Sequence, residues 1–196
     1  MVQQFAQKAF IVRGDHILMV RKSSEDPHNP LRWEVPGGRM LFGEDIDDHI
    51  KREVFEETGI GVNPGKPFHV WQWVMHGPGE PPDQGTQVVA LARKCSPTSF
   101  QISTDGRDES DHLDLAKWIP IEKLLSLDLI PSLRPAAEIF FSNWEKSQHV
   151  HPVRRLRVWF GSLSGLSRRT AGISAGKRPR RSGGPKKSSA SSIQEV

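Results

Sequence analysis

Three glutamates that lie close together in the chain are the residues best suited to do chemistry. Glu53, Glu56 and Glu57 are spaced i, i+3 and i+4, so a helix would place their carboxylates on one face. Like charges at this spacing cost a helix roughly 0.2–0.5 kcal/mol for each pair. A divalent cation removes this repulsion, and a set of carboxylate oxygens suits Mg²⁺ or Mn²⁺ rather than zinc. The alternative is an amphipathic helix with a solvated acidic face.

The residues around these glutamates predict the helix that carries them. Apolar residues recur at every fourth position from Ile46 through Ile50 to Val54, which predicts a helix over residues 46–58 with one buried stripe. Acidic residues fill its first turn, where the helix dipole favours them. Gly59 follows its end, where a left-handed glycine is common.

Residues 38–60 resemble the Nudix box, G-x5-E-x7-R-E-U-x-E-E-x-G-U, where U is a bulky aliphatic residue. The stretch meets the pattern at Gly38, Glu44, Arg52, Glu53, Val54, Glu56, Glu57, Gly59 and Ile60. The preceding W-x-x-P-G-G run, which begins at Trp33, is also similar to what commonly precedes the box. The resemblance extends more weakly over residues 5–147 and implies an α/β/α sandwich built on a mixed β-sheet.

The resemblance implies a metal-dependent pyrophosphohydrolase, in which water attacks phosphorus in a nucleoside diphosphate linked to another group. The residues it implies for the reaction are Arg52, Glu53, Glu56 and Glu57, with the three glutamates and the Gly38 backbone as ligands of Mg²⁺ or Mn²⁺. Glu53 as the general base is left open, and Arg52 is expected to orient the glutamates or to pair with Glu44. Glutamine at position 56 or 57 is expected to remove most turnover while disturbing only a solvent-facing charge.

Other candidate site residues lie outside the box. Many relatives recruit an acid from a late loop, and the candidates here are Glu109, Asp111 and His112, with Glu80 and Asp83 in an earlier loop. Solvated loop charges are the alternative for each. An aromatic platform for a base could come from Trp33, Phe42 or Trp73, and Trp71 alternates onto the same strand face as Trp73. The chain contains no tyrosine, and the sequence leaves the nucleotide unspecified.

Periodicity and turn signals predict the elements that position the site. Strands are expected at residues 5–13, 16–22, 31–35, 68–75, 86–94, 100–103 and 115–120, and further helices at residues 121–127 and 133–147. Gly14 and Asp15 predict a hairpin between the first two strands. Residues 68–75 are apolar on both alternating faces, which predicts an interior strand. This mixed order predicts an α/β fold with a sheet covered on both sides.

Charge divides the chain in two. Residues 1–150 hold 16 Lys and Arg against 22 Asp and Glu, whereas residues 151–196 hold 11 against 1. We therefore expect a Nudix domain over residues 1–148 and a basic, Gly/Ser-rich, disordered tail over residues 149–196. The tail is either solvated or a nucleic-acid contact.

The remaining expectations concern compartment and partners. A single cysteine, no membrane-spanning apolar run and no secretory signal predict a cytoplasmic protein without membrane contact. The expected partner is a nucleotide-type small molecule, and a homodimer is suggested only by analogy with relatives. The alternative function is a non-catalytic nucleotide-binding or RNA-associated protein with the Nudix fold.

Overall fold

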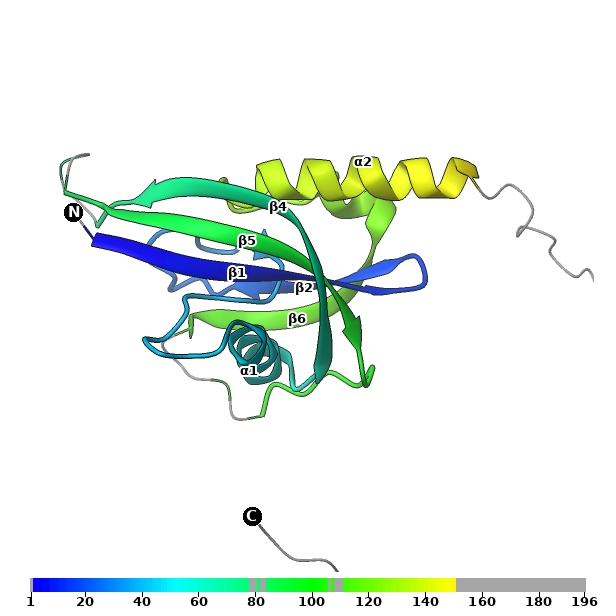
Figure 1. The fold of residues 1–196 in the computed structure, drawn as a ribbon, viewed down its shortest axis with the longest axis horizontal. Coiled ribbons are helices and arrows are strands. Elements are labelled where there is room, and N and C mark those ends of the chain that lie inside the picture. Colours follow the sequence, from blue (N-terminus) through cyan, green and yellow to red (C-terminus); the bar gives the residue numbers. More distant parts are fainter. Residues whose placement is uncertain (1, 78–80, 82–83, 106, 108–110, 151–196) are drawn as a thin grey trace, which may run out of the picture. The chain divides into compact units, whose positions relative to one another are not determined.

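The computed structural model describes residues 2–77, 81, 84–105, 107 and 111–150. A mixed six-stranded sheet lies between two long helices (Figure 1). The elements are β1 (Val2–Arg13), β2 (His16–Lys22), β3 (Trp33–Glu34), α1 (Ile46–Thr58), β4 (Val62–Met75), β5 (Thr86–Pro97), β6 (Leu113–Pro120), the 3₁₀ helix η2 (Ile121–Ser126) and α2 (Arg134–Val150). This arrangement confirms the predicted α/β/α sandwich. The predicted tail, residues 149–196, lies almost wholly outside the described residues.

The sheet brings together strands that are far apart in the chain. The strand order is β3-β2-β1-β5-β4, and β6 also pairs with β2. Only β1 and β5 run parallel among these pairs. The predicted hairpin is confirmed, because β1 and β2 are antiparallel and Gly14 between them has a φ of 60°.

Each helix covers its own apolar cluster. Ile50 and Val54 of α1 pack with residues of β1 and β2 and with Cys95 of β5, all of them buried. On the other side of the sheet, Phe10 of β1 and Phe140 of α2 lie 4.9 Å apart between ring centroids. The two clusters hold the sheet between the helices, with α1 on the face opposite to α2 (Figure 1).

Local signals set both ends of α1. The Asp45 side chain accepts hydrogen bonds from the N–H groups of Asp47 and Asp48 at 2.8 and 3.2 Å, and such a cap contributes about 1 kcal/mol. Gly59 follows the helix with a φ of 68°, and its N–H donates to Phe55 O at 2.8 Å. The predicted bounds of this helix are confirmed.

Three predictions about the elements are wrong. β4 is the edge strand of the sheet rather than an interior one, and Val70 and Val74 are 59% and 48% exposed. Residues 100–103 form no strand, although Phe100 contacts the Trp118 ring. Ile46, the first residue of the expected buried stripe, is 43% exposed because it lies at the very start of α1.

No helix among the described residues is both long enough and apolar enough to span a membrane.

Candidate active site

The carboxylates of α1 meet the Gly37–Gly38 turn, which follows β3. The Gly37 N–H donates to Glu57 Oε2 at 2.9 Å. A Cβ atom at Gly38 would overlap the Glu53 carboxylate, so any larger residue there would displace this carboxylate from the turn. The turn is itself held against β1, because the Gln7 N–H donates to Gly38 O at 3.0 Å. β1 and α1 together therefore fix two carboxylates on one short piece of backbone.

Glu57 is the most deeply buried of the three glutamates, with 6% of the residue exposed. Burial raises the pKa of its carboxyl to about 8; Lys8 opposes the rise, whereas Glu34 and Glu53 add to it. An ionised Glu57 is thus short of neighbouring positive charge. The expectation of a solvent-facing charge at this position is wrong, because the Gly37–Gly38 turn covers it.

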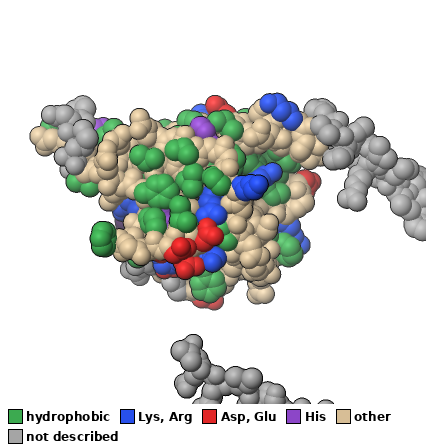
Figure 2. Space-filling model, viewed as in Figure 1, with side chains coloured by type: hydrophobic (Ala, Val, Ile, Leu, Met, Phe, Trp, Pro, Cys, Tyr) green, Lys and Arg blue, Asp and Glu red, His purple; other side chains and the backbone are tan. Residues whose placement is uncertain are grey.

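Arg52 joins the other two glutamates. Its NH1 lies 3.0 Å from Glu53 Oε1 and donates to Glu56 Oε2 at 2.9 Å. The side chain of Glu53 is 14% exposed and that of Glu56 is 47% exposed. Figure 2 shows acidic and basic side chains gathered over α1.

A further acid, Glu44, holds Arg52 in a bidentate ion pair. Arg52 Nε donates to Glu44 Oε1 at 2.6 Å, and NH2 donates to Oε2 at 3.0 Å. Hydrogen bonding from Arg52 lowers the pKa of Glu44 to about 2, and the Leu41 N–H contributes to the shift. The same pair raises the pKa of Arg52. The predicted pairing of Arg52 with Glu44 is confirmed, and it leaves Arg52 with a fixed direction toward Glu53 and Glu56.

Glutamine at position 44 should remove part of the acid sensitivity of folding. The Glu44 carboxyl has a depressed pKa, so its stabilising effect is full above the unfolded value near 4.5 and is lost as pH falls toward about 2. We expect the free energy of unfolding of the wild type to fall more steeply than that of Glu44→Gln over this window. Urea unfolding at a series of pH values measures both slopes, and equal slopes would contradict the assignment.

A buried polar group next to the site was missed by the sequence analysis. Lys8 Nζ lies 2.6 Å from Glu34 Oε2 and also donates to the Gly37 carbonyl, and Lys22 Nζ lies 3.3 Å from Glu34 Oε1. Lys8 and Glu34 are 7% and 3% exposed. Burial alone would lower the pKa of Lys8, but the charges of Glu34 and Glu57 outweigh it and raise that pKa. The signal in the sequence was Lys8 itself, a charged residue in the middle of the strand predicted at residues 5–13.

The candidate loop residues divide into described and undescribed ones. Glu80, Asp83 and Glu109 lie outside the described residues. The backbone carbonyl of Asp111 accepts a hydrogen bond from Lys22 Nζ at 3.0 Å. His112 has a φ of 49°, and its carbonyl accepts a hydrogen bond from the Ser23 N–H at 2.6 Å. The roles of these residues in the reaction stay predictions.

The aromatic candidates occupy different environments. Trp71 and Trp73 share a face of β4, as predicted, and their rings stack with centroids 6.1 Å apart. They pack against three small buried residues of the neighbouring strands, Ala6, Val88 and Ala90. Trp33 is half-buried against the core cluster of α2. Phe42 lies fully in solvent.

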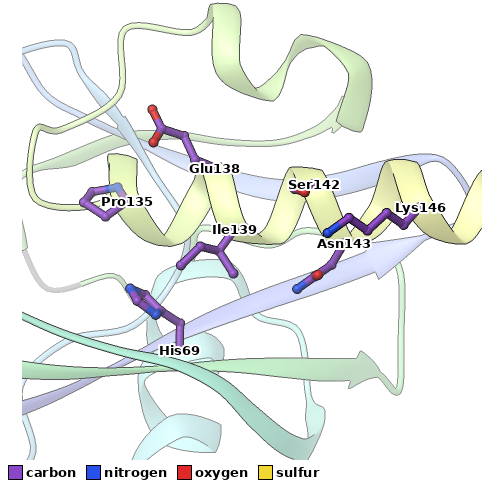
Figure 3. A pocket seen from close by; sticks show the side chains of 7 residues that line it. All are labelled: His69, Pro135, Glu138, Ile139, Ser142, Asn143 and Lys146. Atoms are coloured by element: carbon purple, nitrogen blue, oxygen red, sulfur yellow. The ribbon is translucent and has the colours of Figure 1, made fainter.

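A groove of about 490 Å³ lies between β4 and α2, away from the glutamates. Its lining residues are His69, Pro135, Glu138, Ile139, Ser142, Asn143 and Lys146 (Figure 3). All except His69 belong to α2, on the opposite side of the sheet from α1 (Figures 1 and 3). We place the candidate active site at Glu53, Glu56 and Glu57 of α1, because none of these three residues lines the groove.

The donor chemistry around the Gly37–Gly38 turn fits a divalent cation. Glu53 and Glu57 contact the turn, and burial raises the pKa of the Glu57 carboxyl, so a cation bound beside it would favour the ionised form. Among the described residues, no three His, Cys, Asp or Glu side chains form a metal cluster, and Glu56 accepts a hydrogen bond from Arg52. The Gly38 carbonyl accepts the Gln7 N–H, which leaves one of its lone pairs for a ligand.

Comparison with protein-family models gives one match, to the NUDIX domain, over residues 3–141. A MutT-like protein of Streptomyces ambofaciens is 30% identical over 89 residues, which are 45% of this chain and 48% of that protein. A putative 8-oxo-dGTP diphosphatase 2 of Mycobacterium tuberculosis is 36% identical over 62 residues, which are 32% of this chain and 43% of that protein. The chain thus spans about half the length of the curated relatives it matches.

Solved structures show the same fold. The MutT protein from Methanosarcina mazei Go1 superposes with a TM-score of 0.58 at 22% identity, over 74% of this chain and 96% of that one. The Escherichia coli ORF135 protein gives a TM-score of 0.57 at 20% identity, over 74% of this chain and 94% of that one. Both likenesses concern the arrangement of the strands and helices described above.

Proposed function

The chain belongs to the NUDIX family, and we propose that it is a metal-dependent pyrophosphohydrolase acting on a nucleotide-type substrate. The observation that carries the proposal is the approach of Glu53 and Glu57 to the Gly37–Gly38 turn. Buried or half-buried carboxylates that meet at one piece of backbone suit a cation bound together with phosphate oxygens. The names of the MutT-like protein and of the 8-oxo-dGTP diphosphatase agree with a nucleoside phosphate as substrate.

The proposed reaction is hydrolysis of a phosphoanhydride. Water adds to one phosphorus atom, the bridging P–O bond breaks, and two phosphate products leave. A bound Mg²⁺ or Mn²⁺ would neutralise the diphosphate and favour deprotonation of the water. Glu56 and Glu57 are assigned to metal binding, and Glu53 either completes that set or accepts the proton of the water. Arg52, held by Glu44, fixes the directions of Glu53 and Glu56.

A platform for the nucleotide base is proposed on β4. Trp71 is paired in register with Ala90, and Ala90 is paired with Ala6, so the tryptophans border a floor of small side chains. Trp71 is fixed by a hydrogen bond from its Nε1 to Ser132 O at 2.6 Å. Ala6 and Lys8 are two residues apart on β1 and therefore lie on the same side of that strand. Lys8 contacts Gly37, which links the floor to the glutamates.

A panel of phosphate-containing substrates tests the proposed function. It should cover nucleoside triphosphates including 8-oxo-dGTP, ADP-ribose, nucleotide sugars and capped RNA, each with Mg²⁺, with Mn²⁺ and with a chelator. We expect turnover of at least one nucleotide that stops when the cation is removed. Turnover that persists in the chelator, or a folded, metal-bound protein that is silent across the whole panel, would contradict the proposal.

Alanine at position 73 should weaken substrate binding more than it slows the chemical step. Stacking on an aromatic side chain is worth about 1–3 kcal/mol per base, so we expect KM to rise by about 5- to 150-fold with kcat little changed. Val74→Ala is the matched control, because Val74 lies next to Trp73 but points to the other face of β4, where it is 48% exposed. Equal effects of the two substitutions on KM would remove Trp73 from the platform.

A further inference from the structure

His49 lies in the middle of α1 and is completely buried, although its imidazole carries two polar nitrogens. Its Nδ1 lies 2.9 Å from Gln7 Nε2, which belongs to β1 and is equally buried. Its Nε2 lies 3.5 Å from Glu53 Oε1 and makes no hydrogen bond in the structure. Buried polar atoms nearly always have a hydrogen-bond partner, so the lack of one at His49 Nε2 needs an explanation.

Gln7 decides which nitrogen of His49 carries the proton. Gln7 Nε2 donates to the Ile46 carbonyl at 2.6 Å, and Gln7 Oε1 accepts from Arg93 NH1 at 3.4 Å. A carbonyl cannot donate and a guanidinium cannot accept, so these two contacts identify the amide nitrogen of Gln7. The second hydrogen of that nitrogen points to His49 Nδ1, which must therefore accept. A neutral imidazole with an accepting Nδ1 carries its proton on Nε2, facing Glu53.

The Glu53 carboxylate is consequently bounded on three sides. Arg52 NH1 lies 3.0 Å from Oε1, the Gly38 backbone lies against Oε2, and His49 Nε2 lies 3.5 Å from Oε1 on the buried side of α1. Arg52 reaches Glu53 from the more exposed side, since its own side chain is 27% exposed. The completely buried His49 thus approaches Glu53 from the protein interior.

We propose that His49 is a positioning residue, which donates its Nε2–H to Glu53 and so holds this carboxylate in the orientation that the cation and the diphosphate require. The proposal rests on the proposed function. The role needs no proton transfer to or from the imidazole, because the neutral ring already presents the donor. Gln7 acts through His49 by fixing the tautomer.

Two substitutions at position 49 distinguish the role of Nδ1 from that of Nε2. Asparagine at position 49 places an amide near the former Nδ1 and keeps a partner for Gln7, but offers Glu53 no donor. Glutamine reaches further and places an N–H near the former Nε2. The full chain of each variant would be titrated with Mn²⁺ alone by calorimetry, melted thermally, and assayed for kcat and KM. His16→Asn is the control, because His16 lies at the β1–β2 hairpin, where it pairs with Arg13 of β1 and Pro120 of β6 and contacts Asp15.

We expect His49→Asn to raise the Mn²⁺ dissociation constant and to lower kcat by about 10- to 100-fold, the usual cost of losing a group that orients a metal ligand. His49→Gln should recover most of both losses, whereas KM and the melting temperature should be similar in the two variants. Equal losses in both variants would reduce His49 to a packing residue, and wild-type Mn²⁺ affinity in both would also overturn the proposal. Absence of metal-dependent turnover in the wild type would instead contradict the proposed function.

A second measurement does not depend on the folding of variants. Two-bond ¹H–¹⁵N NMR of the full-length wild type reports the tautomer of a buried histidine. The proposal requires a neutral His49 with its proton on Nε2, and a shift of that resonance when Mg²⁺ is added. The proposal would be overturned by a proton on Nδ1. It would also be overturned if the protein bound Mg²⁺ and the chemical shift of the His49 resonance did not change.

Discussion

Glutamine at position 57 should reduce kcat by about 100- to 1000-fold, because losing one charged ligand forfeits several kcal/mol of metal-ion stabilisation at 1.36 kcal/mol for each tenfold change in rate. Glu56→Gln should act in the same direction. The control is Glu138→Gln, which changes an exposed acid on α2, on the other side of the sheet. Retention of full activity by both Glu56→Gln and Glu57→Gln would remove these residues from the reaction.

Glu57→Gln should be less active than the wild type but more stable at pH 8 when no divalent cation is present. The pKa of Glu57 is raised, so its contribution to stability is most favourable below the unfolded value near 4.5 and is lost as pH rises toward about 8. Without divalent cations, the wild type should therefore lose stability between pH 5 and pH 8, by up to a few kcal/mol. The stability of Glu57→Gln should not fall in this way, because glutamine has no carboxyl group to ionise. Thermal melts in a chelator at both pH values measure it, and parallel pH dependence in the two proteins would contradict the assigned burial of the charge.

Methionine at position 8 should produce the largest loss of stability. Lys8→Met leaves Glu34 buried with only the more distant Lys22 as partner. Breaking a buried ion pair typically costs 3–5 kcal/mol, which corresponds to a fall in melting temperature of roughly 6–20 °C for a domain of this size. Thermal unfolding followed by circular dichroism measures the change.

Two companion variants make that result interpretable. Lys51→Met removes an ion pair to Asp48 whose side chains are 47% and 71% exposed, so it should change the free energy of unfolding by less than about 0.5 kcal/mol. Lys8→Met combined with Glu34→Leu replaces both buried charges with apolar groups, and the double variant should be more stable than Lys8→Met alone. A double variant no more stable than Lys8→Met alone would show that the loss does not come from leaving Glu34 buried without its partner.

The sequence predicted best what neighbouring residues determine. α1 has the predicted bounds because its buried residues Ile50 and Val54, its acidic first turn and Gly59 all act within the helix. The positions of the three glutamates on this helix follow from their spacing for the same reason, whereas their role in the reaction stays a prediction. β4 shows the limit of such reasoning: Val70 and Val74 are as apolar as interior residues, but strand order depends on pairings between distant segments.

The environment of the glutamates could not be predicted, because it depends on contacts across the chain. Glu57 is buried by the Gly37 backbone, 20 residues away, and Lys8 meets Glu34 across 26 residues. The pairing of Gln7 with His49 spans 42 residues. The Gly37–Gly38 turn likewise runs beside β1 through the hydrogen bond from the Gln7 N–H to Gly38 O, and no local sequence pattern reveals any of these contacts.

The single cysteine of the chain makes this protein convenient for site-specific labelling. Cys95 is 6% exposed, and burial raises the pKa of its thiol to about 11. The thiolate is the form that reacts with maleimides, so at neutral pH the native thiol should be nearly inert while the protein is folded. A cysteine introduced on the surface, for example at Glu25 in the exposed loop after β2, can thus carry a fluorophore in the wild-type background. The slow rate at which the Cys95 thiol reacts would in turn measure how often β5 opens by local unfolding.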